Sequence, residues 1–271
     1  YAPPNYLRMA MFLELSRPEG DVSRWEKVLK RLTLLNKFYP LKSSLCGQID
    51  FQRNMASPNK DKSDILFEII RNNLVDQGVV FFGAYANSIY SQYMPKNVQR
   101  RLKKVPDFEV LSLEIDRTAL ILSEELKRSG FQDVVTNEIE AIGELVPRKI
   151  EVMVGKEVLA YIYEPIACHS YNTITLGKSK VNIATIDTIL TFYLSFLYVN
   201  SDGEYDSDRL LCMAQFLFDV QEKNRLSQKG LLKRFNMQCI GKQPTLEEMR
   251  AEKAEKFKEL KSKRNSREFE R

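Results

Sequence analysis

The chain has 271 residues, of which 44% are hydrophobic and 28% charged, the composition of an ordinary globular protein with one large or two ordinary domains. No apolar run approaches the roughly 18 residues that a membrane-spanning helix needs, which excludes an integral membrane protein of that kind. The formal charge of +5 suits a partner that carries phosphates but does not require one.

The cysteines predict neither a zinc site nor a disulfide framework. Cys46, Cys168, Cys212 and Cys239 stand singly, without C-x-x-C spacing, and the chain has one histidine. We therefore expect reduced thiols in a cytosolic setting. The first residues, YAPPNYLRM, hold neither a signal-peptide core nor an initiator Met, so we expect the sequence to be a trimmed one.

Residues 1–60 are predicted to form an N-terminal helical accessory region. An apolar stripe at helical spacing predicts one helix from Val22 to about Lys37. The segment SLCGQIDFQRN favours a short strand or loop, and the polar run ASPNKDK after it predicts a domain boundary near residue 60.

The next segment predicts a helix, a strand, a tight turn and another helix. The first helix begins at Ser63 and stops before Gly78. The apolar run Val79–Phe82 is typical of a buried strand, and Gly83 marks the turn into a second helix. The basic connector PKNVQRRLKK then leads to a further strand.

That strand, VPDFEVLSLE (105–114), places two acids on alternate positions. Successive strand side chains point to opposite faces, so Asp107 and Glu109 share one face and Phe108 and Val110 the other. Two neighbouring carboxylates repel each other, and a bound cation would explain the arrangement. The alternative is an ordinary solvated strand face.

An amphipathic helix ended by Gly130 follows, and then two strands, RKIEVMV and EVLAYIY, joined by a two-residue turn at Gly155 and Lys156. Together these elements predict a small α/β palm domain over residues 61–165. Counting outward from the hairpin turn pairs Val154 with Glu157 and places Glu151 opposite Ala160.

Residues 166–271 are predicted to form a mainly helical domain. The run 183–199 is apolar nearly all round, as in a central core helix, and 210–220 supplies a second helix. A capping box from Thr245 to Glu248 opens a charged helix. This last part of the chain is rich in Lys and Arg, which favours a basic surface or a partner-binding helix.

An apolar strand, a glycine followed by a small residue, a helix, and then two alternating acids on the next strand resemble the nucleotidyltransferase superfamily of DNA polymerase β and the poly(A) polymerases. The segments FGAYANSIY, VPDFEVLS, IYEPIACHSYN and IATIDTILTFYLSFLY are similar to the catalytic subunit of the poly(A) polymerases of poxviruses and giant DNA viruses. The resemblance runs from about residue 24 to 220. It implies an α+β fold with a polymerase β-like palm of mixed sheet and flanking helices.

The resemblance implies template-independent transfer of AMP from ATP to RNA 3′ ends, with two Mg²⁺ or Mn²⁺ ions. Asp107 and Glu109 would bind the metals, which prefer hard oxygen ligands. The backbone N–H groups of Gly83 and Ala84 would hold phosphate oxygens at a helix N-terminus. Glu151 would supply the third carboxylate, as a metal ligand or general base, and the alternative is a surface ion-pair residue beside Lys149.

Three features depart from the superfamily pattern. Ala84 replaces the usual glycine or serine, Glu109 replaces the commoner aspartate, and the gap between Gly83 and Asp107 is long, which predicts an inserted loop. The position most naturally aligned with the third acid is Ala160 or Tyr161, and neither can bind a metal.

The segment CHSYNTITLGKSK is where such polymerases commonly hold the nucleotide. Ser170 and Asn172 could contact the ribose hydroxyls and Lys178 the triphosphate, and each could instead have a purely structural role. We expect His169 and Asp187 to be hydrogen-bonded structural residues.

Two other functions remain open on the sequence: a catalytically degenerate nucleotidyltransferase that binds RNA or a partner subunit, and an active enzyme with a small-molecule acceptor. The resemblance implies either a homodimer or a processivity subunit as the partner. It also implies residence in the host cytoplasm, at the viral factory, or in the virion, and no association with a membrane.

Overall fold

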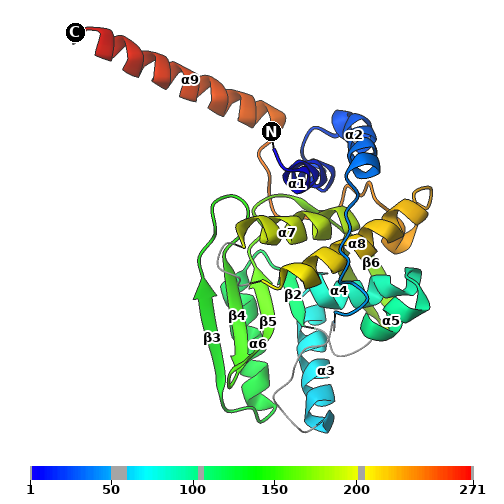
Figure 1. The fold of residues 1–271 in the computed structure, drawn as a ribbon. Helices are drawn as coiled ribbons and strands as arrows, with labels where there is room; N and C mark the ends of the chain where they lie inside the picture. The colour runs from blue at the N-terminus through cyan, green and yellow to red at the C-terminus, as the bar shows by residue number, and fades with distance from the viewer. Residues whose placement is uncertain (1, 50–59, 103–106, 201–204, 270–271) are drawn as a thin grey trace.

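A computed structural model describes residues 2–49, 60–102, 107–200 and 205–269 (Figure 1). Within these residues the α-helices are α1 (Pro4–Leu15), α2 (Trp25–Phe38), α3 (Lys60–Asp76), α4 (Gly83–Tyr90), α5 (Lys96–Leu102), α6 (Ile115–Arg128), α7 (Ile186–Val199), α8 (Ser207–Lys223) and α9 (Leu246–Phe269). Short 3-10 helices are η1 (Val22–Arg24), η2 (Ser91–Tyr93) and η3 (Gly230–Leu232). The strands are β1 (Val80–Phe82), β2 (Phe108–Leu111), β3 (Val134–Ile139), β4 (Lys149–Val154), β5 (Glu157–Tyr163), β6 (His169–Leu176), β7 (Ser179–Ala184) and β8 (Cys239–Ile240).

The strands form one mixed sheet in the order β3-β4-β5-β2-β1-β7-β6-β8. The central pairs β2–β5 and β1–β7 are parallel, whereas β1–β2, β3–β4, β4–β5, β6–β7 and β6–β8 are antiparallel. The strand that carries Glu109 therefore lies in the middle of the sheet, between β5 and β1.

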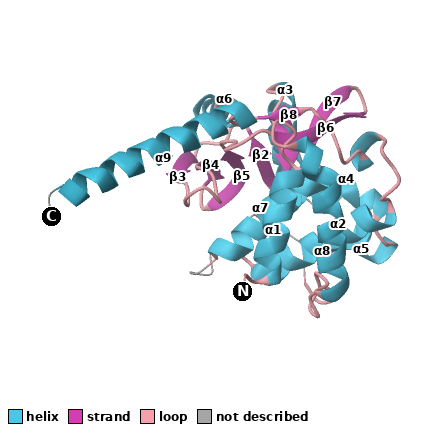
Figure 2. Ribbon diagram, turned by 90° about the horizontal axis from the view of Figure 1, so that it is seen from above, coloured by secondary structure: helices cyan, strands magenta, loops and turns pink. Residues whose placement is uncertain are grey.

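Helices cover both faces of the sheet (Figure 2). On one face Phe108 of β2 stacks on Phe67 of α3, with ring centroids 5.0 Å apart, and α6 packs against β3, β4 and β5. On the other face Phe82 of β1 stacks on Phe192 of α7 at 4.7 Å. Helices α1 and α8 pack against α7 from outside. Since Phe82 pairs with Glu109 in the sheet, Glu109 points to the face that α7 covers.

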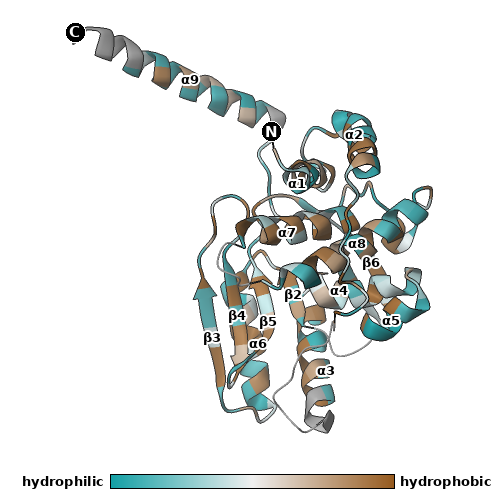
Figure 3. Ribbon diagram, in the orientation of Figure 1, coloured by the Kyte–Doolittle hydropathy of each residue, from teal (hydrophilic) through white to brown (hydrophobic). Residues whose placement is uncertain are grey.

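The apolar run predicted as a single helix is a strand followed by a helix. Residues up to Ala184 belong to β7, and Thr185 caps α7 by accepting a hydrogen bond from the amide of Thr188. Side chains from Ile186 through Phe196 are buried, which explains why α7 is apolar on nearly every side (Figure 3).

Several other predicted elements are confirmed, some with shifted ends. The helix predicted from Val22 is η1 followed by α2, and the helix predicted from Ser63 is part of α3. The tight β4–β5 turn is present, with Gly155 at φ +62°. The capping box is confirmed, because Thr245 and Glu248 each accept a hydrogen bond from the other's amide, at 3.2 and 2.7 Å. The loop predicted after the glycine turn contains helix α5.

The parts of the chain on either side of the predicted domain boundaries pack together. Helix α1, which the sequence did not predict, lies against α7, so residues before 60 contact residues after 165. Strands β6 and β7 extend the sheet beyond residue 165 and precede the helices α7, α8 and α9. Most of the polar linker ASPNKDK falls outside the described residues, and the three-part division stays a prediction.

The prediction of reduced thiols is wrong in this structure. Cys46 is bonded to Cys212 and Cys168 to Cys239, and both pairs bring Cα atoms to 5.2 Å. The partners are separated by 166 and 71 residues in the chain, so only the tertiary fold brings them together. Sequence spacing alone could not reveal either pair.

Helix α9 stands away from the rest of the molecule (Figures 1 and 2). Its side chains are charged for the most part, with salt bridges one turn apart between Glu252 and Lys256 and between Glu259 and Lys263. Among the helices of the described residues, none is long and apolar enough to cross a membrane.

Candidate functional site

The two acids predicted from the sequence lie in one cleft. Asp107 directly precedes β2, Glu109 lies within it, and both are partly buried. The cavity measures about 270 Å³. It is lined by Ala84, Asp107, Glu109, Lys149, Glu151, Tyr161, Tyr163, Tyr193, Phe196, Tyr205, Asp206, Arg209, Leu210 and Met213. The alternative of an open, solvated strand face is therefore wrong.

The glycine turn contacts the acid strand directly. Gly83 begins α4 with φ +68°, and a Cβ atom built on it would lie 2.1 Å from Oε2 of Glu109. Only glycine fits this close approach. The amide of Ala84 donates a hydrogen bond to the same oxygen at 2.8 Å. The N–H group predicted to hold a phosphate therefore holds the Glu109 carboxylate in this structure.

The environment of Glu109 favours its neutral form. Burial, and to a smaller extent the neighbouring charge of Asp107, raise the pKa of Glu109 to about 8. The amide of Ala84 and the charge of Arg209, on the first turn of α8, act in the opposite direction on this pKa. A cation bound beside the two carboxylates would offset both the burial and the repulsion.

Glu151 shares the cleft face with Glu109 but lies two strands away. Glu109 pairs with Tyr161 of β5, and Tyr161 pairs in turn with Glu151 of β4. With neighbouring strands about 4.8 Å apart, the backbones at the two acids are roughly 10 Å apart. The predicted pairing of Glu151 with Ala160 is wrong, because an irregularity between Val152 and Met153 shifts the register by one residue.

The carboxylate of Glu151 already has two partners. The Nζ atom of Lys149 lies 3.5 Å from one oxygen, and the side-chain amide of Asn137 donates to the other at 3.3 Å. The ion pair considered as the alternative role is thus present. It is not on the surface, however, because the side chain of Lys149 is 4% exposed and that of Glu151 13%.

Several residues of the cleft were not recognised from the sequence. Lys149, Tyr161 and Tyr163 share the cleft face with Glu151 through strand alternation, a signal that the hairpin pattern does contain. Tyr205 and Arg209 reach the cleft from the start of α8. Nothing in the local sequence around these two residues indicates that position.

The structure places Ser170, Asn172 and Lys178 away from the acids. The hydroxyl of Ser170 lies 2.7 Å from the hydroxyl of Thr185, within a buried network. The side chain of Asn172 is buried and donates to the carbonyl of Lys233 at 2.9 Å. Both side chains are therefore hydrogen-bonded inside the protein, as expected for a purely structural role.

Lys178 lies in the turn between β6 and β7. Because β7 runs parallel to β1, with Phe81 beside Ile183, this turn lies at the end of the sheet opposite Gly83. A triphosphate bound at the amide of Ala84 would extend far from Lys178.

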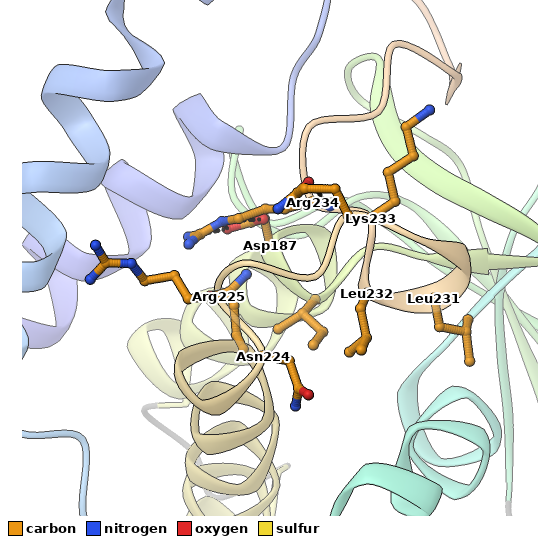
Figure 4. A pocket seen from close by; sticks show the side chains of 10 residues that line it. Asp187, Asn224, Arg225, Leu231, Leu232, Lys233 and Arg234 are labelled. Atoms are coloured by element: carbon orange, nitrogen blue, oxygen red, sulfur yellow. Dashed lines mark hydrogen bonds and ion pairs between the residues drawn. The ribbon is translucent and has the colours of Figure 1, made fainter.

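Asp187 and His169, both predicted to be hydrogen-bonded structural residues, differ in their hydrogen bonding. Asp187 is fully buried and accepts hydrogen bonds from the guanidinium of Arg234 at 2.8 to 3.1 Å, which confirms that it is a satisfied polar group (Figure 4). His169 is buried, and burial lowers its pKa to about 3. The expected hydrogen bonds are absent, since neither ring nitrogen has a partner among the described residues.

The acids of the cleft do not form a preassembled three-ligand group. Among the described residues, three potential ligand atoms within 4.8 Å of one another occur only at Glu19, Cys168 and Cys239, and the two sulfurs are bonded to each other. The cleft therefore offers the adjacent pair Asp107 and Glu109 as its candidate metal ligands.

Comparison with known proteins gives a likeness of fold alone. No protein-family model and no curated protein matches the sequence. The crystal structure of the Megavirus polyadenylate synthase is similar to this chain, with a TM-score of 0.72 and 16% sequence identity. The alignment covers 96% of this chain and 54% of the other, so the chain spans about half the length of that protein. The mixed sheet with its flanking helices is therefore similar in fold to about half of that viral polyadenylate synthase.

Proposed function

We propose that this chain is a nucleotidyltransferase that adds AMP from ATP to RNA 3′ ends without a template. The observation that carries this is the contact of Glu109 with the Gly83–Ala84 turn, beside Asp107 in one cleft. The fold shared with a polyadenylate synthase supports RNA as the acceptor and ATP as the donor.

Asp107 and Glu109 would hold the divalent ions, Mg²⁺ or Mn²⁺. The fit rests on the raised pKa of Glu109, since burial and the Asp107 charge both penalise an ionised carboxylate that a cation would stabilise. When bound, such ions would stabilise the attacking and leaving oxygens of phosphoryl transfer. Glu151 is paired with Lys149, so two carboxylates of this chain are assigned to the metals.

The amide of Ala84 would donate a hydrogen bond to a phosphate oxygen of the nucleotide. Its hydrogen bond to Glu109 keeps a helix N-terminal donor satisfied. Movement of the Glu109 carboxylate toward a cation would free this donor for a phosphate oxygen. The missing Cβ of Gly83 leaves the space in which this exchange takes place.

Extension of a short labelled RNA, with Mg²⁺ and each nucleoside triphosphate supplied separately, tests the function. We expect extension with ATP. Asp107→Ala should abolish extension, a loss of about 10³-fold or more, while RNA binding stays nearly unchanged because the lost interaction belongs to the metals. Asp133→Ala, at an exposed acid outside the cleft, is the matched control. No extension by the unaltered chain with any nucleotide would refute the enzyme.

A second candidate is a catalytically degenerate nucleotidyltransferase that binds RNA or a partner subunit. One observation favours it: the residue beside Glu109 on the neighbouring parallel strand is Tyr161, which offers no carboxylate. Titration with Mn²⁺ separates the two candidates, because a degenerate cleft would show no metal-dependent binding of ATP. The net charge of +5 speaks against a small-molecule acceptor, and extension of the labelled RNA would do the same.

For the partners we propose the RNA 3′ end and either a second copy of this chain or a processivity subunit. The exposed Phe257 and Leu260 of α9 offer apolar contact area for such a partner. Residence in the host cytoplasm or the virion belongs to the same proposal.

A further inference from the structure

The ammonium group of Lys149 is enclosed by tyrosines at the wall of the acid cleft. Its Nζ atom lies 5.3 Å from the ring centre of Tyr161, 5.9 Å from that of Tyr163 and 5.5 Å from that of Tyr205. Lysine is almost never this deeply buried, at 3% exposure, unless its charge is compensated. The aromatic faces compensate part of the charge by cation–π attraction.

The enclosure is built from both sides of the cleft. Tyr161 and Tyr163 project from the sheet, and Tyr205 covers the lysine from the segment that leads into α8. The ring of Tyr205 is itself held by stacking on Phe196 of α7, with centroids 4.8 Å apart and planes at 6°. The ammonium is therefore fixed at one place in the cleft wall.

The ion pair with Glu151 holds Lys149 at the cleft wall. The 3.5 Å separation of Nζ and the carboxylate is longer than a strong charge-assisted hydrogen bond, which is about 2.7–2.9 Å. Lys149 lines the wall of the cavity, so an anionic oxygen entering the cleft would meet this ammonium there.

The charges around the cleft indicate which ligand fits there. Asp107 and Glu109 mark one side, where cations would bind, and Lys149 marks the sheet wall two strands away. Arg209 adds a second cation from α8. A ligand that meets cations bound at the acids on one side and an ammonium on the other is a polyphosphate, whose oxygens can bind both.

We infer that Lys149 is a phosphate-binding residue for the polyphosphate of the nucleotide, and that Glu151 is a positioning residue that holds Lys149 and not a ligand of the metals. This rests on the proposed function and assigns two residues within it. The tyrosine enclosure fixes the ammonium in the cleft wall before the nucleotide arrives.

Equilibrium binding tests the assignment, with ATP, inorganic triphosphate and adenosine as separate probes in the presence of Mn²⁺. Lys149→Met keeps the length and apolar stem of the side chain and removes the charge. We expect it to weaken binding of ATP and of triphosphate by about tenfold or more and to leave adenosine binding unchanged. Lys156→Met, in the exposed turn of the same hairpin, is the matched control and should bind like the unaltered chain.

Glu151→Gln separates the positioning role from metal binding. We expect a loss of roughly two- to fivefold in triphosphate affinity, with an unchanged Mn²⁺ concentration for half-maximal ATP binding. A shift of that Mn²⁺ midpoint by tenfold or more would make Glu151 a metal ligand and overturn the assignment. If Lys149→Met does not fold, triphosphate binding is measured with Lys149→Arg and Tyr205→Leu instead. Both substitutions should weaken this binding measurably while the fold is kept.

The outcomes also separate this inference from the function on which it rests. If the unaltered chain binds neither ATP nor triphosphate, the nucleotidyltransferase itself is refuted. If the unaltered chain binds both and folded Lys149→Met binds them equally well, only the role of Lys149 is refuted.

Discussion

Glu109 links the two halves of the cleft, the acid strand and the glycine turn. Its carboxylate accepts the amide of Ala84 and occupies the place that a Cβ of residue 83 would need. The cost of this position is electrostatic, because burial and Asp107 both favour the protonated carboxyl. Under the proposed function, the same residue would connect metal binding, phosphate binding and the stability of the folded chain.

The raised pKa of Glu109 predicts a pH dependence of stability. Since this pKa is about 8 in the folded chain against a usual 4.5, the folded state binds the extra proton between these values. The contribution of Glu109 to stability is therefore most favourable at low pH, falls as the pH rises toward 8 and stays low above it. Glu109→Gln should remove this fall, raising the melting temperature at pH 9 by several degrees relative to the unaltered chain.

Melting curves of both proteins between pH 5 and pH 9 check this, and the difference between the two curves cancels the titration of all other groups. Mg²⁺ added at pH 9 should raise the melting temperature of the unaltered chain and not that of Glu109→Gln. Parallel curves over the whole pH range would show that Glu109 titrates normally.

At the level of elements, the β4–β5 hairpin is predictable from the sequence except for its register. The two strands, their turn and their face alternation follow from the sequence, because Gly155 and the apolar spacing are local signals. The one-residue shift at Val152 and Met153 does not, because it depends on how β5 packs between β4 and β2. That shift decides which residue faces Glu151, Tyr161 instead of Ala160.

Elements that depend on tertiary contacts were missed for a related reason. Helix α1 has no strong amphipathic pattern and is held by α7, and Arg8 within it is buried, donating to the side chain of Asn36 at 2.7 Å. Strands β6 and β7 were not predicted, although the alternation of exposed Thr173 and Thr175 with the more buried Ile174 and Leu176 is a local strand signal. The acid pair and the glycine turn were predictable because both are short, local motifs.

Helix α9 should contribute little to the stability of the fold. Its described side chains are exposed apart from partly buried Met249, and its salt bridges are local surface pairs of small value. A chain ending after residue 245 should therefore melt within about 2 °C of the full chain. Calorimetry of both proteins checks this, and a drop of 5 °C or more would mean that α9 packs against the body or mediates self-association.

For the molecule as a whole, the disulfides join segments that are distant in the chain. Cys46, in the turn after α2, is bonded to Cys212 of α8, the helix that carries Arg209 into the cleft. Cys168 is bonded to Cys239 beside β6 and β8. Together with α1 on α7, these bonds tie the N-terminal and C-terminal parts of the chain to the sheet.

Loss of the Cys46–Cys212 bond should destabilise the chain. The double variant Cys46→Ser/Cys212→Ser should lower the free energy of unfolding by about 2–4 kcal/mol, because the bond closes a loop of 166 residues in the unfolded chain. Denaturant titration measures this loss. A thiol reductant would also break the Cys168–Cys239 bond, so it should destabilise the unaltered chain by at least as much as the double substitution does. Four titratable thiols in the folded, unreduced protein would contradict the pairing altogether.

We propose above that Asp107 and Glu109 bind divalent ions beside a phosphate site at the Gly83 turn. The most direct measurement is a crystal structure of the full chain with Mn²⁺ and a nonhydrolysable ATP, with the metal located by its anomalous scattering. We expect Mn²⁺ between the two carboxylates, the Glu109 side chain released from Ala84, and a phosphate oxygen on that amide. Metal and nucleotide bound elsewhere, with Glu109 still hydrogen-bonded to Ala84, would contradict the proposal.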